Sequence, residues 1–153
     1  MGSPVGGPIT VTGVDCGALQ DSPPVDVTIR VRYAETDQMG IVYYANYFVW
    51  FEIGRTEILR QRGFSYRALE EEEGCYIVVA NAACTFRASA RYDDLITIRT
   101  WLKEVRSRVV VFSYEVISDK GRRLANGETT HVVTDLNGKP RALPEAYRRA
   151  LQS

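Results

Sequence analysis

The sequence predicts an α+β protein in which one curved antiparallel sheet of about five strands wraps around a long buried helix. Three patterns support this fold class: an alternating strand-like segment, a following helix that is apolar on most sides, and a run of further strands. Residues 1–24 are rich in Gly, Pro, Ser and Val and are expected to be a flexible N-terminal segment. No internal repeat or second domain is recognisable, so residues 25–153 are expected to be a single domain.

The first strand is predicted from Val25 to Tyr33, where apolar residues alternate with charged residues and threonine. A turn that ends at Gly40 follows. The long helix is expected from about Asn46 to Arg62, because its apolar residues recur with helical periodicity. Gly54 lies inside this helix at a cost of roughly 1 kcal/mol against alanine, which predicts close packing against another backbone.

The rest of the chain predicts two short helices and four strands. Residues 65–73 form a polar helix closed by Gly74, and its consecutive glutamates are expected to be a solvated face. Pro144 opens a short terminal helix. The strands are expected at Tyr76–Arg87, Leu95–Val105, Val109–Ser118 and Leu124–Asp135.

Composition excludes several classes of function. Lys and Arg number 19, as do Asp and Glu, so the zero net charge predicts neither nucleic-acid nor membrane partners. Cys16, Cys75 and Cys84 lack a CxxC spacing, which argues against a disulfide framework or a zinc site and favours a cytoplasmic location. His131 is the only histidine, which excludes multi-histidine metal sites. One histidine still allows a Ser-His-Asp triad, although a lone histidine on a strand favours a structural role.

One carboxylate, Asp37, lies in the turn between the first strand and the long helix. A negative charge close to a helix N-terminus is favoured by the helix dipole, so a catalytic arrangement is possible here. An ordinary turn residue, whose side chain bonds nearby amides, would occupy the same position. The spacing alone favours this second interpretation.

The motif around Asp37 is longer than a turn requires. The segment Asp37–Tyr47, DQMGIVYYANY, is preceded by RYAET and followed shortly by WFE. With this motif, the chain from about Val25 to Leu151 resembles the 4-hydroxybenzoyl-CoA thioesterase-like family. This group of hotdog-fold acyl-CoA thioesterases includes the Tol–Pal-associated thioesterases. Later echoes of the family pattern are found at Ala90–Asp94 and Gly138–Pro144.

The resemblance implies an enzyme that hydrolyses an acyl-CoA to a free acid and coenzyme A. Asp37 would act as nucleophile or general base, and the backbone amide of Tyr44 would polarise the thioester carbonyl. Gly40, Ile41 and Val42 would contribute to the substrate site. A helix N-terminus offers such unpaired amides, and a thiol with a pKa of roughly 8.5 leaves without a strong acid. No metal and no cofactor are expected, since the CoA thioester is the substrate.

Position 44 departs from part of the family. Many relatives in the Tol–Pal branch carry histidine there, whereas Tyr44 is closer to the aryl-CoA branch. The difference argues against a histidine-assisted mechanism and favours an aromatic or bulky acyl group. Packing explains Tyr43, Tyr44, Tyr47 and Trp50 equally well.

A second group of candidate residues would bind the nucleotide of CoA. Arg106, Ser107 and Arg108 lie where aryl-CoA thioesterases carry a basic segment that contacts the nucleotide phosphates. Two guanidiniums beside a hydroxyl suit phosphate, and a solvent-facing hairpin turn is the alternative. Arg87 and Arg91 are weaker candidates, because neighbouring aspartates can pair with them.

The resemblance also implies assembly and leaves other functions open. Members of the family form dimers whose sheets join, so a homodimer assembling into a homotetramer is expected. A non-catalytic acyl-CoA-binding module is one alternative, and a thioesterase for acyl-carrier-protein thioesters is another. A hydratase or dehydratase is a third, but such enzymes usually pair an acid with histidine in the active segment.

Overall fold

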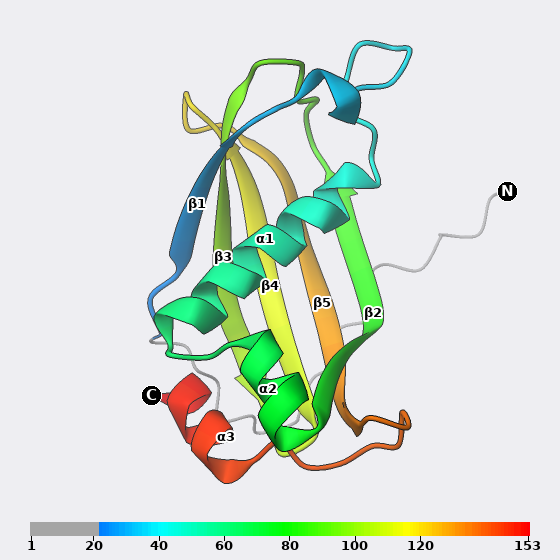
Figure 1. Ribbon diagram of the computed structural model, residues 1–153. Coiled ribbons are helices and arrows are strands. Elements are labelled where there is room, and N and C mark those ends of the chain that lie inside the picture. Colours follow the sequence, from blue (N-terminus) through cyan, green and yellow to red (C-terminus); the bar gives the residue numbers. More distant parts are fainter. Residues whose placement is uncertain (1–21) are drawn as a thin grey trace, which may run out of the picture.

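One antiparallel sheet and one long helix form the body of the protein. The computed structural model describes residues 22–153, so most of the expected N-terminal segment lies outside the described residues. The five strands follow the order β1-β3-β4-β5-β2, and α1 crosses one face of the sheet (Figure 1). The elements are β1 (Val25–Arg30), η1 (Tyr33–Glu35), α1 (Asn46–Gln61), α2 (Tyr66–Glu73), β2 (Cys75–Phe86), β3 (Leu95–Val105), β4 (Val109–Ser118), β5 (Arg123–Asp135) and α3 (Glu145–Gln152).

The first strand is shorter than its alternating pattern predicts. It ends at Arg30, and the chain turns into the single 3₁₀ turn η1, whose Tyr33 is 77% exposed. The expectation that Tyr33 belongs to the apolar face of the strand is therefore wrong. The backbone N–H of Arg32 donates to the Glu35 carboxylate, and this cap favours the turn over a continued strand.

The inner face of α1 packs closely on the sheet. Trp50, Phe51 and Ile58 are completely buried there. A Cβ atom added to Gly54 would lie 2.2 Å from Oγ1 of Thr100 on β3, so no larger residue fits without a shift. The close approach predicted at Gly54 is confirmed, but the neighbouring atoms belong to side chains of β3 rather than to a backbone.

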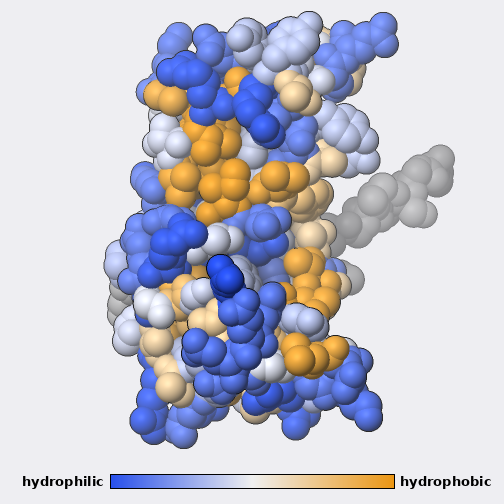
Figure 2. All heavy atoms as spheres, viewed as in Figure 1, coloured by the Kyte–Doolittle hydropathy of each residue, from blue (hydrophilic) through white to orange (hydrophobic). Residues whose placement is uncertain are grey.

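The outer side of α1 differs from the prediction of a helix buried on most sides. Val49 and Ile53 remain 48% and 39% exposed, because the sheet covers only the opposite side of the helix. Val78 and Val79 of β2 are exposed as well, and β2 lies at one edge of the sheet. Hydrophobic residues gather over α1 and beside β2 in Figure 2. Within residues 22–153, no helix is long and apolar enough to cross a membrane.

Candidate active site

Asp37 lies in a short closed loop between η1 and α1. Its N–H donates to the carbonyl of Ile41 at 2.8 Å, and its own carbonyl accepts from Gly40 at 3.0 Å. Gly40 has a φ of +79°, a left-handed conformation that favours glycine. The Asp37 side chain accepts from the Met39 N–H through Oδ1 at 2.8 Å. Its other carboxylate oxygen has no hydrogen-bond partner among residues 22–153.

The Tyr44 amide lies in the turn that leads into α1. The helix begins at Asn46, so Tyr44 precedes it by two residues rather than starting it. The helical turn has nevertheless begun, because Asn46 N–H donates to Tyr43 and Tyr47 N–H donates to Tyr44. No residue in the described part of the chain accepts a hydrogen bond from the Tyr44 N–H. The amide is one of the unpaired donors at the start of a helix.

Asp37 and Tyr44 border the same open cavity of about 300 Å³. The structure thus brings together four of the predicted site residues, Asp37, Ile41, Val42 and Tyr44. Gly40 is not part of the cavity wall, and its carbonyl accepts from Nη1 of Arg91 at 3.4 Å. The complete lining is Asp37, Met39, Ile41, Val42, Tyr44, Tyr47, Phe86, Arg87, Ala88 and Ser89.

One wall of the cavity is aromatic. Phe86 meets Tyr47 edge to face, with ring centroids 5.0 Å apart, and meets Tyr44 in the same way at 6.4 Å. Burial raises the pKa of Tyr47, so its phenol stays neutral at physiological pH. Tyr47 and Trp50 are buried, so both pack in the core, and Tyr47 also lines the cavity.

Asp37 and Arg87 are the charged side chains of the cavity lining. Arg87 follows the end of β2, and its Nε donates to Oδ1 of Asn126 at 2.8 Å. Neighbouring aspartates do not hold this guanidinium, contrary to the expectation. Arg91 does meet Asp94, but through its backbone N–H.

Sequence reasoning missed the wall formed by residues 86–89, except for Arg87. These residues are distant from Asp37 in the sequence and carry no motif of their own. The useful signal was the family echo at Ala90–Asp94, which follows them directly. Ala90 is completely buried, and its carbonyl accepts from Val42 N–H at 2.8 Å, so the echo marks the segment that packs against the Asp37 loop.

Arg106, Ser107 and Arg108 do not reach this cavity within one chain. They form the turn between β3 and β4, at the end of the sheet opposite the loop of Asp37 (Figure 1). The Ser107 carbonyl accepts from Leu143 N–H, and Arg106 forms an ion pair with Glu104. These residues could contribute to the same site only from a second copy of the chain.

His131 lies in the core instead of the cavity. It is 1% exposed on β5, and its Nε2 lies 2.8 Å from Oγ1 of Thr129. A triad that includes this histidine does not form at the cavity of Asp37. Within the described range, no group of three or more His, Cys, Asp or Glu side chains is arranged to hold a metal ion.

Comparisons with known proteins agree with the fold. Residues 31–151 match the thioesterase-like superfamily. The putative acyl-CoA thioesterase YneP of Bacillus subtilis is 34% identical over 80% of this chain and 86% of its own length. The acyl-CoA thioester hydrolase YbgC of Escherichia coli is 37% identical over 77% of this chain and 88% of its own length. The structure of DHNA-CoA thioesterase from Staphylococcus aureus matches with a TM-score of 0.81 and 28% identity, covering 84% of this chain and 89% of that one.

The chain therefore belongs to the thioesterase-like superfamily and has the hotdog fold. It is an enzyme of the thioester hydrolase class. The family and the enzyme class implied by the motif around Asp37 are confirmed, and so is the α+β fold class predicted from the order of strands and helices.

Proposed function

We propose that this chain is an acyl-CoA thioesterase in which Asp37 is the catalytic carboxylate and the Tyr44 N–H binds the thioester oxygen. One observation carries the proposal: Asp37 and Tyr44 border the same open cavity. Each has an unused hydrogen-bonding position among residues 22–153, an oxygen on Asp37 and the N–H on Tyr44. Hydrolysis of a thioester needs these two functions, a base or nucleophile and a donor for the oxyanion.

The reaction requires little more than these two groups. The carbonyl carbon is attacked either by a water that Asp37 deprotonates or by the Asp37 carboxylate itself. Negative charge then develops on the carbonyl oxygen, where the Tyr44 N–H stabilises it. Collapse of the tetrahedral intermediate breaks the C–S bond and releases CoA as a thiolate, because a thiol pKa of roughly 8.5 makes it a good leaving group. In the nucleophilic route, water hydrolyses the resulting anhydride.

The cavity wall supports an aromatic or bulky acyl group. Tyr44, Tyr47 and Phe86 line the cavity, and aromatic rings favour offset and edge-to-face contacts with a further ring. The Staphylococcus aureus relative is a DHNA-CoA thioesterase. We therefore expect aryl-CoA esters to react faster than linear acyl-CoA esters of similar size.

A homodimer formed through β2 would complete the site. The free edge of β2 and the exposed Val78 and Val79 favour pairing with a second chain. Antiparallel pairing of two β2 strands reverses the second copy, so its β3–β4 turn lies at the same end as the cavity of the first. Arg106, Ser107 and Arg108 could then bind the CoA phosphates of the neighbouring site. The expected homotetramer stays a prediction.

Thiol release over a panel of acyl-CoA esters tests the proposal. We expect Asp37→Asn to lower kcat by roughly 10²- to 10⁴-fold, the usual contribution of a positioned acid or base. Asp93→Asn is the matched control, since Asp93 is exposed, lies outside the cavity and should leave kcat unchanged. Full hydrolytic activity of Asp37→Asn would exclude the mechanism.

The same panel separates the alternative functions. A parent protein that binds acyl-CoA tightly without turnover would instead be a non-catalytic acyl-CoA-binding module. A much higher kcat/KM for acyl-carrier-protein thioesters than for the CoA esters would identify the carrier protein as the natural donor of the acyl group.

A further inference from the structure

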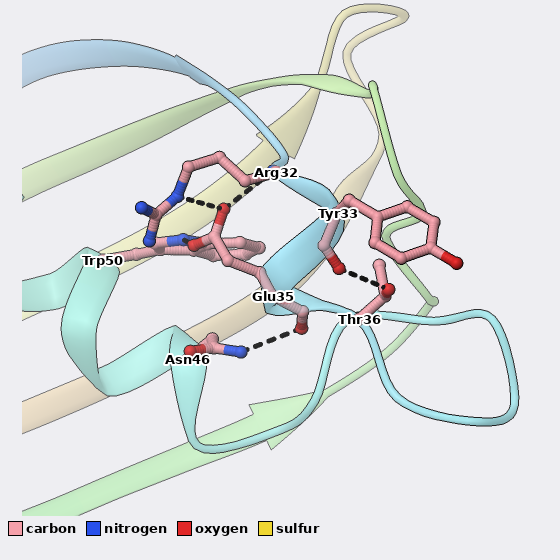
Figure 3. A network of polar contacts seen from close by, with 6 residues as sticks. All are labelled: Arg32, Tyr33, Glu35, Thr36, Asn46 and Trp50. Atoms are coloured by element: carbon pink, nitrogen blue, oxygen red, sulfur yellow. Dashed lines mark hydrogen bonds and ion pairs between the residues drawn. The ribbon is translucent and has the colours of Figure 1, made fainter.

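Glu35 is a buried carboxylate that sequence analysis did not single out. Only 5% of the residue is exposed, and both side-chain oxygens are occupied (Figure 3). Oε1 accepts from the Arg32 N–H at 2.8 Å, and Oε2 accepts from Nε1 of Trp50 at 2.7 Å. Trp50 is completely buried on α1. The second bond therefore ties the loop before Asp37 to the core of the protein.

The backbone of Glu35 holds the other half of the candidate site. Its carbonyl accepts from the N–H of Tyr43 and from Nδ2 of Asn46, each at 2.8 Å. These two donors lie on either side of Tyr44 in the sequence. Figure 3 shows the Asn46 amide pointing at this carbonyl from the start of α1. Glu35 thus contacts α1 with its side chain and the Tyr44 turn with its carbonyl.

Asp37 follows Glu35 by two residues, and the intervening Thr36 pairs with Val42 across the loop. Glu35 therefore contacts both the segment that leads to the proposed base and the turn that carries the proposed oxyanion donor. A displacement of about 1 Å in such a pair of groups typically costs about 10²-fold in rate. The loop itself is short of apolar anchors, because Gln38, Met39 and Gly40 are exposed.

We propose that Glu35 is a positioning residue for thioester hydrolysis, which fixes the Asp37 carboxylate relative to the Tyr44 amide by anchoring both to Trp50. The inference rests on the proposed function. Glu35 is not the reacting carboxylate, because it is buried, both of its oxygens are engaged, and it is absent from the cavity lining. Burying a carboxylate is costly unless donors satisfy it, and here the Arg32 N–H, the Trp50 indole and an ion pair with Nε of Arg32 at 3.4 Å do so.

The test compares Glu35→Gln and Trp50→Phe with the parent enzyme. Glutamine keeps the size of the side chain but replaces one acceptor oxygen with an NH₂ group, which cannot accept from the facing donor. Phenylalanine keeps an aromatic ring and removes the indole N–H. Each change should lower kcat by roughly 10- to 100-fold and leave KM within about threefold, because transition-state contacts lose more than substrate binding. The double variant should be little worse than the poorer single variant, since both act through one bond.

Hydrogen exchange supplies a measurement that does not depend on activity. Amides of residues 36–47 should exchange faster in Glu35→Gln, while those of β3 and β4 keep the rates of the parent. Glu71→Gln is the matched control, because Glu71 is an exposed acid on α2 that pairs only locally with Arg67. It should alter neither kcat nor exchange in residues 36–47.

Two results would overturn the inference. One is a Glu35→Gln enzyme whose kcat stays within about twofold of the parent; the other is a loss of kcat that only follows a loss of folded protein, measured at the same temperature. A parent without any thioesterase activity would instead overturn the proposed function. In that case the exchange rates of residues 36–47 alone decide whether Glu35 holds this segment.

Discussion

Acidification from pH 7.5 to pH 5.0 is expected to lower the free energy of unfolding by about 2 kcal/mol through His131 alone. The ring is buried on β5, and Nδ1 has no hydrogen-bond partner among residues 22–153. Burial, together with the positive charge of Arg55 on α1, lowers the pKa of His131 from 6.5 to about 4. Thr129 faces Nε2, and Oη of Tyr114 from β4 is bonded to the same Thr129 hydroxyl at 2.6 Å.

The sign follows from the two pKa values. In the unfolded chain the histidine binds a proton below about pH 6.5, whereas in the native protein it stays neutral until about pH 4. The unfolded state therefore binds more protons within this window, and stability falls as the pH falls. At about 1.4 kcal/mol for each pKa unit, the complete loss is about 3 kcal/mol, of which about 2 kcal/mol is reached at pH 5.0.

Urea unfolding at several pH values between 7.5 and 5.0 measures this loss as a falling midpoint with a constant slope. The chain contains one histidine, so no second imidazole obscures the window. His131→Phe and His131→Gln, whose side chains do not titrate, should lose most of the pH dependence even if their stability at pH 7.5 is lower. A variant that loses as much stability on acidification as the parent would refute the reasoning and assign the effect to other groups.

Two further predictions follow from packing and from assembly. Gly54→Ala should lower the free energy of unfolding by about 1 to 3 kcal/mol, because the added methyl group overpacks against Thr100. In a Thr100→Ala background the loss should be clearly smaller. Equal losses in the two backgrounds, measured by urea unfolding, would contradict this contact. Mixing the Asp37→Asn variant with the Arg106→Ala/Arg108→Ala double variant should restore activity at low substrate concentration. If the arginines serve the neighbouring chain, each mixed dimer contains one intact site, with Asp37 from one chain and both arginines from the other. An inactive mixture that has exchanged subunits would remove these arginines from the shared site.

Element boundaries were predictable from the sequence wherever one physical pattern dominated. The long helix was expected to within one residue, because its apolar periodicity ends at Gly63, which adopts a φ of +76°. The same periodicity could not show which sides of the helix the sheet covers, so Val49 and Ile53 were expected to be buried. The first strand was extended too far because the Glu35 cap, a side-chain contact, ends the alternating pattern without any change of composition.

The candidate site was predictable only in its local part. The motif around Asp37 identified residues that are close together in the chain, and most of them line the cavity. Phe86 and its neighbours come from the far end of β2, and only the sheet topology brings them to Asp37. The bond between Glu35 and Trp50 was also out of reach, since an acid in a loop gives no sign of the indole that buries it.

The two interpretations of Asp37, turn residue and catalytic group, are compatible in the structure. Oδ1 accepts the Met39 N–H and orients the carboxylate, which leaves the second oxygen without a partner within residues 22–153. Asn at this position can keep the turn bond through its carbonyl oxygen but replaces the second oxygen with NH₂. Asp37→Asn therefore removes the base and retains the loop, whereas Asp37→Ala removes both. If Asp37 served only the turn, Asp37→Ala would be the impaired variant and Asp37→Asn would remain active.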